Sequence, residues 1–105
     1  MTQDIAPPDA CGSMTELRAA IDALDARLVA MLALRQRYIE RAAVLKAARD
    51  AVRDEARIEE VVRHVVAEGK RVGLSPAIAE RVWRMLIEAS IAHEYDAFDA
   101  KGAAQ

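Results

Sequence analysis

The chain has 105 residues and a mass of 11.5 kDa, which is the size of a single domain. Hydrophobic residues make up 53% of it but aromatic residues only 4%, and there are just four glycines and three prolines. This composition predicts a helical core of aliphatic side chains and excludes a many-stranded β-fold, which needs more turn residues. Fifteen Lys and Arg residues against seventeen Asp and Glu residues give a formal net charge of -2, without the basic excess that nucleic-acid binding requires.

Targeting signals are not visible in the sequence. The first ten residues lack both the cationic start and the apolar stretch of a signal peptide, and no apolar run approaches the length of a membrane span. The single cysteine, Cys11, cannot form an internal disulfide. We therefore expect a cytoplasmic protein that does not bind membranes.

The sequence of the N-terminal half predicts a disordered tail followed by one long helix. Residues 1–13 contain two prolines, a glycine and few side chains to bury, so we expect a disordered tail. Ser13 and Glu16 have the spacing of a capping box, which predicts a helix beginning at Met14. No helix breaker follows before about Asp50, so this helix is expected to span about 35 residues and about 52 Å.

The long helix has an apolar seam with one interruption. Apolar residues recur at alternating spacings of four and three, which is the heptad pattern of a helix that packs along another helix. Arg35 occupies one seam position. The other seam residues are Leu17, Ile21, Leu24, Leu28, Met31, Tyr38, Ala42 and Leu45. Two shorter helices cannot cover a helix of this length, so we expect a symmetric homodimer with antiparallel long helices.

Two shorter helices are predicted downstream, which makes the fold class all-α with three helices per chain. Asp54 can cap the second helix, and Gly69 and Gly73 end it. Ser75 and Pro76 supply the N-cap and first residue of the third. The second helix has the apolar stripe Ile58, Val61, Val62, Val65 and Val66. The third has the stripe Ile78, Val82, Met85 and Ala89, flanked by Trp83, Ile87, Ser90 and Glu94. Residues 14–99 form the predicted helical domain, and residues 100–105 are expected to fray.

Cationic residues near the seam predict an anion site. Arg35 on an apolar seam is costly to bury unless an anion meets it, and Lys46 lies within about 20° of the same helix face, about 16 Å further along the axis. The alternatives are a structural ion pair for Arg35 and a solvated helix end for Lys46. Arg18 is about 25 Å from Arg35 along the helix, so it reaches the same ligand only from an antiparallel partner; the alternative, and the commoner case, is a surface arginine of the first turn. Arg57, at the start of the second helix, either closes the pocket or is an exposed surface residue.

The third helix adds two polar residues to a mostly apolar face. Ser90 and Glu94 are one turn apart, and a protonated Glu94 in a dry pocket can donate a hydrogen bond, whereas Ser90 is ordinarily explained by a bond back to a carbonyl. His64 and His93 lack metal-ligand spacing, and no phosphate loop or Ser-His-Asp motif is present. These residues indicate a pocket for a small dicarboxylate, without metal or cofactor, in which catalysis would rest on positioning and electrostatics.

A specific family resemblance follows from these segments. LRAAIDALDARLVAMLALR, then Lys46, VRDEARIEEV and LIEASIAHE resemble the all-helical (AroQ-class) chorismate mutase family, from Met14 to about Phe98. The resemblance implies an intertwined homodimer in which each long helix contributes to both active sites. It implies the Claisen rearrangement of chorismate to prephenate, a step of the shikimate pathway toward aromatic amino acids, with no cofactor.

The resemblance also implies roles for individual residues. Arg18 of the partner subunit and Arg35 would bind the substrate carboxylates, while Lys46 and a protonated Glu94 would donate to the ether oxygen. The remaining substrate-binding residues implied are Asp54 and Arg57, around the ring hydroxyl and the far wall of the pocket, and Ser90, beside the ring carboxylate.

Two positions depart from the better-known mutases. Glu94 stands where many members have Gln, which implies activity that rises toward acid pH. Ile58 stands where many have Glu, and isochorismate pyruvate lyases of the same fold resemble this chain in having an aliphatic residue there. A lyase that releases salicylate and pyruvate from isochorismate is therefore the first alternative. A non-enzymatic helical dimerisation module is the second, and it does not explain why Arg35 and Lys46 share a helix face.

Overall fold

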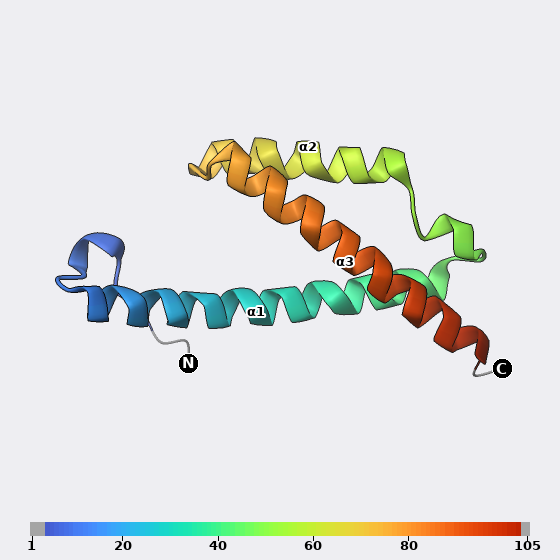
Figure 1. The fold of residues 1–105 in the computed structure, drawn as a ribbon, viewed down its shortest axis with the longest axis horizontal. Coiled ribbons are helices and arrows are strands. Elements are labelled where there is room, and N and C mark those ends of the chain that lie inside the picture. The colour runs from blue at the N-terminus through green and yellow to red at the C-terminus, as the bar shows by residue number, and fades with distance from the viewer. Residues whose placement is uncertain (1–3, 104–105) are drawn as a thin grey trace. The chain divides into compact units, whose positions relative to one another are not determined.

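Helices account for the secondary structure of residues 4–103, the part of the chain described by the computed structural model (Figure 1). Three α-helices span Met14–Leu45 (α1), Glu55–Val72 (α2) and Pro76–Ala103 (α3), with short 3-10 helices at Pro8–Ala10 (η1) and Arg49–Ala51 (η2). The all-α fold with three helices is therefore confirmed. The expected tail and frayed end include residues 1–3 and 104–105, which lie outside the described residues.

The chain divides within α1 into two units, residues 1–37 and residues 38–105. In the first unit, α1 begins at the predicted residue: the Ser13 hydroxyl oxygen accepts a hydrogen bond from the Glu16 backbone N–H at 3.1 Å. The Glu16 carboxylate in turn accepts from the backbone N–H of Gly12 at 3.0 Å, one residue earlier than in the standard capping box. The bond to Ser13 satisfies one of the backbone donors that a helix start leaves unpaired.

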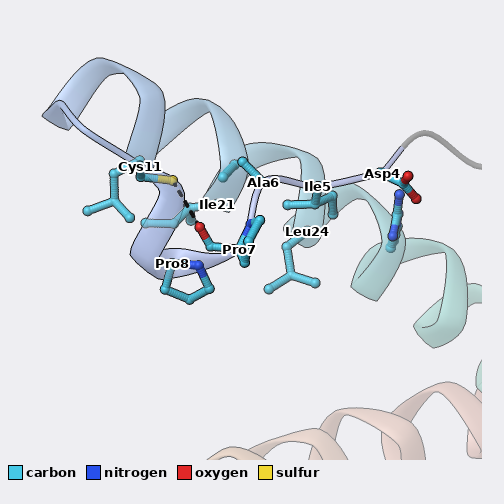
Figure 2. A pocket seen from close by; sticks show the side chains of 11 residues that line it. Asp4, Ile5, Ala6, Pro7, Pro8, Cys11, Ile21 and Leu24 are labelled. Atoms are coloured by element: carbon cyan, nitrogen blue, oxygen red, sulfur yellow. Dashed lines mark hydrogen bonds between the residues drawn. The ribbon is translucent and has the colours of Figure 1, made fainter.

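The segment before α1 lies against the first turns of that helix (Figure 2). It contains η1, and the Cys11 thiol donates to the carbonyl oxygen of Pro7 at 3.7 Å. Between the segment and α1 lies an open, mainly apolar pocket of about 630 Å³. None of the residues singled out for chemistry lines this pocket, so it is not the predicted anion site.

The apolar seam of α1 in the first unit is exposed in the single chain. Leu28, at its middle, is 53% exposed, and the neighbouring seam residues Ile21, Leu24 and Met31 are similarly accessible. Exposure of so many large aliphatic side chains along one helix is typical of a surface that packs against another protein. The homodimer stays a prediction.

In the second unit, α2 and α3 pack against each other as a helical hairpin (Figure 1). The core between them consists of Ile58, Val62 and Ile87, with Val61, Val66, Trp83 and Ile91 partly buried around it. This confirms the predicted stripe of α2, whose apolar residues recur at the helical period. Packing against α2 fixes the orientation of α3 and therefore of its polar residues.

The predicted stripe of α3 is wrong for the single chain. Ile78, Val82 and Met85 are all exposed, whereas Ala79 and Ile87 are buried. α3 has apolar residues on two adjacent faces, and α2 packs on the face that we had taken as the flank. Helical periodicity cannot rank two adjacent apolar faces, because both satisfy the same repeat.

α1 also ends earlier than predicted, at Leu45 instead of about Asp50. Lys46 donates its backbone N–H to Ala42 at 3.0 Å, and the chain then becomes extended at Ala48 before η2. No proline or glycine marks this end, so nothing local in the sequence predicts it.

Gly73 forms the turn between α2 and α3. Its φ is +85°, in the left-handed region, and its N–H bonds back to the carbonyl oxygens of Gly69 and Lys70. Gly69 lies inside α2 and does not end it. A Cβ at Gly69 would come within 3.4 Å of the Leu74 Cβ, so this glycine permits the close approach of the turn.

Gly73→Ala is expected to lower the free energy of unfolding by about 1 kcal/mol, because an L-residue pays a steric cost in the left-handed region. Urea denaturation followed by circular dichroism measures this. The matched control is Gly102→Ala in α3, where an added Cβ meets no atom within 4 Å and alanine favours the helix. Equal losses in both variants would contradict the explanation.

Candidate functional site

Lys46 and Glu94, two of the residues predicted to be catalytic, meet in the second unit. Lys46 is the residue directly after α1, Glu94 lies on α3, and the Lys46 Nζ donates to Glu94 Oε2 at 2.6 Å. Glu94 is 4% exposed and is the only charged residue that is buried among residues 4–103. A carboxylate buried this deeply requires a counter-charge, and Lys46 supplies it.

α3 positions Glu94 by continuing the face that packs against α2. Ile87 is buried in the hairpin core, Ile91 is packed against it, and Glu94 follows Ile91 by three residues. Ser90 precedes Glu94 by one turn and is half-buried. The hydrophobic core thus fixes the helix face that presents both predicted polar residues.

A further hydrogen bond joins α3 to the C-terminal part of α1. His93, the residue before Glu94, has its Nε2 2.6 Å from Oε2 of Glu40 on α1. His93 is partly exposed. Its contact with Glu40 was not predicted, since 53 residues separate the two.

The loop after Lys46 is held to α3 by Arg49. Its guanidinium donates to the Asp99 carboxylate at 2.9 Å and stacks over the Tyr95 ring, 4.4 Å from the centroid. The hydrogen bond from Arg49 lowers the pKa of Asp99 below its usual range, so this pair remains charged at neutral pH.

Arg53 binds the last part of the loop to α3 and to the start of α2. It donates through both terminal nitrogens to Glu88 of α3, at 2.9 Å each, and through Nε to Glu55 at the start of α2. The bond from Arg53 lowers the pKa of Glu88. Sequence reasoning missed Arg49 and Arg53, because their carboxylate partners on α3 lie 50 and 35 residues away, respectively, and no local pattern marks such pairs.

The predicted ring-binding residues at the start of α2 make structural contacts. Asp54 accepts from the backbone N–H of Arg57 at 3.1 Å, which confirms it as the N-cap. The exposed Arg57 side chain pairs with Glu60. Ile58 is 8% exposed and belongs to the hairpin core, so it offers no polar group at this position. Their contacts with a substrate stay predictions.

Arg18 and Arg35 lie on α1 within the first unit. Arg18 is exposed, and Arg35 is half-buried. Burial lowers the pKa of the Arg35 guanidinium, which nevertheless keeps its charge at neutral pH. Their predicted convergence with Lys46 on one ligand stays a prediction.

The described residues form neither a metal-ligand cluster nor a membrane-spanning helix. Within residues 4–103, no three His, Cys, Asp or Glu side chains are grouped as metal ligands. No helix in this range has the length and apolar character needed to cross a membrane.

Comparison with known proteins identifies the family. No individual curated protein matches the sequence. The model of the family described as chorismate mutase type II matches residues 17–95, which is most of the chain and includes every candidate site residue from Arg18 to Glu94. On this match, together with the all-helical fold, the chain belongs to the chorismate mutase type II family.

Proposed function

We propose that the protein is a chorismate mutase that converts chorismate to prephenate. The observation that carries this proposal is the contact between Lys46 and the buried Glu94, which brings together two groups able to hydrogen-bond one oxygen atom in a chain of this family. Arg35 and Arg18 of the partner subunit would bind the two carboxylates of the substrate. Ser90, Asp54 and Arg57 would contact the ring and its substituents.

The reaction needs electrostatic stabilisation at the ether oxygen. In the Claisen rearrangement the C–O ether bond breaks while a C–C bond forms, and no atom is gained or lost. Negative charge gathers on the ether oxygen in the transition state. Hydrogen bonds from Lys46 and from a protonated Glu94 are stronger to that charged oxygen than to the neutral ether, and they therefore lower the barrier. No covalent intermediate is required.

The ligand-free ion pair must change before Glu94 can act in this way. In the structure Glu94 accepts from Lys46, and an ionised carboxylate has no hydrogen to donate. A substrate with two carboxylates brings further negative charge beside Glu94, which favours its protonated form. Proton uptake would free Lys46 from the pair and would turn Glu94 into a donor. Activity should therefore be highest at acid pH.

Glu94→Gln is expected to remove this pH dependence, because the amide donates at every pH. For the wild type, kcat/KM should fall about tenfold per pH unit on the alkaline side, as expected for one required proton. The variant should give a flat profile over the same range. Measurement of kcat/KM from acid to alkaline pH tests this, and identical profiles in both proteins would show that Glu94 does not titrate in catalysis.

Isochorismate pyruvate lyase is the second candidate function. The observation that favours it is Ile58, which is buried among apolar side chains and provides no acceptor for a ring hydroxyl at the position where many mutases have Glu. A lyase would use the same cations, Lys46 and Arg35, to bind isochorismate. A hydrogen would then pass from a ring carbon to the methylene carbon of the enolpyruvyl group while the ether C–O bond to the ring breaks, which releases pyruvate and leaves salicylate.

Product analysis decides between the candidates. The purified protein is incubated separately with chorismate and with isochorismate, and products are separated by liquid chromatography. We expect prephenate from chorismate. Salicylate and pyruvate from isochorismate alone would establish the lyase instead, and the absence of product from both substrates would favour the non-enzymatic dimerisation module.

We also propose that the active form is a homodimer in which Arg18 acts across subunits. The exposed apolar seam of α1 supports this, since Ile21, Leu24 and Leu28 would be buried against the second copy. Each site would then need residues from both chains.

Mixing two inactive variants tests the sharing of sites. Arg18→Ala and Lys46→Ala should each abolish activity. After unfolding and joint refolding, activity should return to about a quarter of the wild-type value, since half of the dimers are mixed and each has one intact site. If Arg18 acted within its own chain, every site would be defective and the mixture would stay inactive. Refolded wild-type protein provides the reference.

A further inference from the structure

Lys101, near the end of α3, binds the C-terminal end of α1. Its Nζ donates to the carbonyl oxygens of Ala43 and Lys46 at 2.7 Å each, and to that of Val44 at 3.3 Å. Its ammonium also lies 4.3 Å from the centre of the Phe98 ring, one turn earlier on α3. All three donors of one ammonium group are thus directed at the main chain around Lys46.

This contact supplies hydrogen-bond donors to carbonyl groups at the C-terminal end of α1. The last carbonyls of a helix have no partners within it, and they are commonly stabilised by a basic residue of the same last turn. The last turn of α1 has no basic residue. Lys101 therefore acts as a cap supplied from 55 residues further along the chain, and its charge also favours the negative end of the α1 dipole.

We propose that Lys101 is a positioning residue that fixes the backbone of Lys46 and thereby the place of the Lys46 ammonium. α3 then holds Lys46 at two points, with Glu94 at the side chain and Lys101 at the carbonyl oxygen. Lys46 needs this support because it is the first residue after α1, with an irregular segment following it. The catalytic consequence rests on the proposed function of Lys46, but the positioning itself does not.

The spacing of Glu94 and Lys101 along α3 allows both residues to contact Lys46. Glu94 and Lys101 are seven residues apart, two helical turns, so their side chains leave α3 on nearly the same face. Because α3 is one continuous helix, a position of α3 that brings Glu94 to the Lys46 side chain also brings Lys101 to the Lys46 carbonyl oxygen. Displacement of a catalytic group by about 1 Å costs up to about 100-fold in rate, so loss of one hold is measurable in turnover.

The test compares three lysine variants. Lys101→Met removes the donors but keeps the length of the side chain, and kcat is expected to fall about tenfold with a smaller change in KM. Lys101→Arg keeps charge and donors and should recover most of the activity. Lys70→Met, at the exposed end of α2, is the matched control and should leave kcat unchanged.

A merely structural role would give a different result. In that case Lys101→Met would lower the melting temperature, while kcat per folded molecule would equal that of the wild type. That outcome, or equal losses of kcat in the methionine and arginine variants, would overturn the proposal.

A second readout does not depend on activity. The 13C resonance of the Glu94 side-chain carboxyl reports its pairing with Lys46, and Lys101→Met should shift it in the ligand-free protein while Lys70→Met does not. An unshifted resonance would overturn the proposal. Should the methionine variant not fold, Lys101→Gln, which keeps one amide donor, should give a smaller shift in the same direction, and no shift would count against the proposal. If the wild type proves inactive on both substrates, the proposed function fails while this measurement still tests the positioning.

Discussion

The buried charge of Glu94 is the constraint on which the second unit depends. A carboxylate that is almost fully removed from water is stable only with a counter-charge at close range, and Lys46 provides it at 2.6 Å. Because Lys46 directly follows α1 and Glu94 lies on α3, the ion pair ties the end of α1 to α3. Any rearrangement that separates these helices would leave an unpaired charge in the interior.

The surrounding contacts make this arrangement rigid. Exposed ion pairs such as Arg49–Asp99 contribute little stability individually, since water screens them. They are spread along α3, however, so that Asp99 and Lys101 near its end and Glu94 further back all hold the segment around Lys46. Arg53 adds a bidentate contact with Glu88 near the middle of the same helix. The result is that the Lys46 and Glu94 side chains are held in defined positions relative to α3.

The two units differ in how their apolar residues are used. In the hairpin, α2 and α3 bury Ile58, Val62 and Ile87 against each other. In the first unit, the seam of α1 remains exposed in the single chain, as at Leu28. The same heptad-like spacing therefore serves a different purpose in α1, and association with a second copy is the arrangement that would bury it.

The sequence by itself determined the all-α class, the start of α1 at Met14, the Asp54 cap and the family, because capping residues, helical periodicity and motif spacing are local properties. It also brought out Lys46 and Glu94 as chemically unusual. Only the tertiary structure decided which face of α3 is buried, where α1 ends and that Lys101 holds that end. The buried face of α3 depends on its packing against α2, and the end of α1 depends on contacts with residues of α3 more than 50 positions away, so no local pattern encodes either feature.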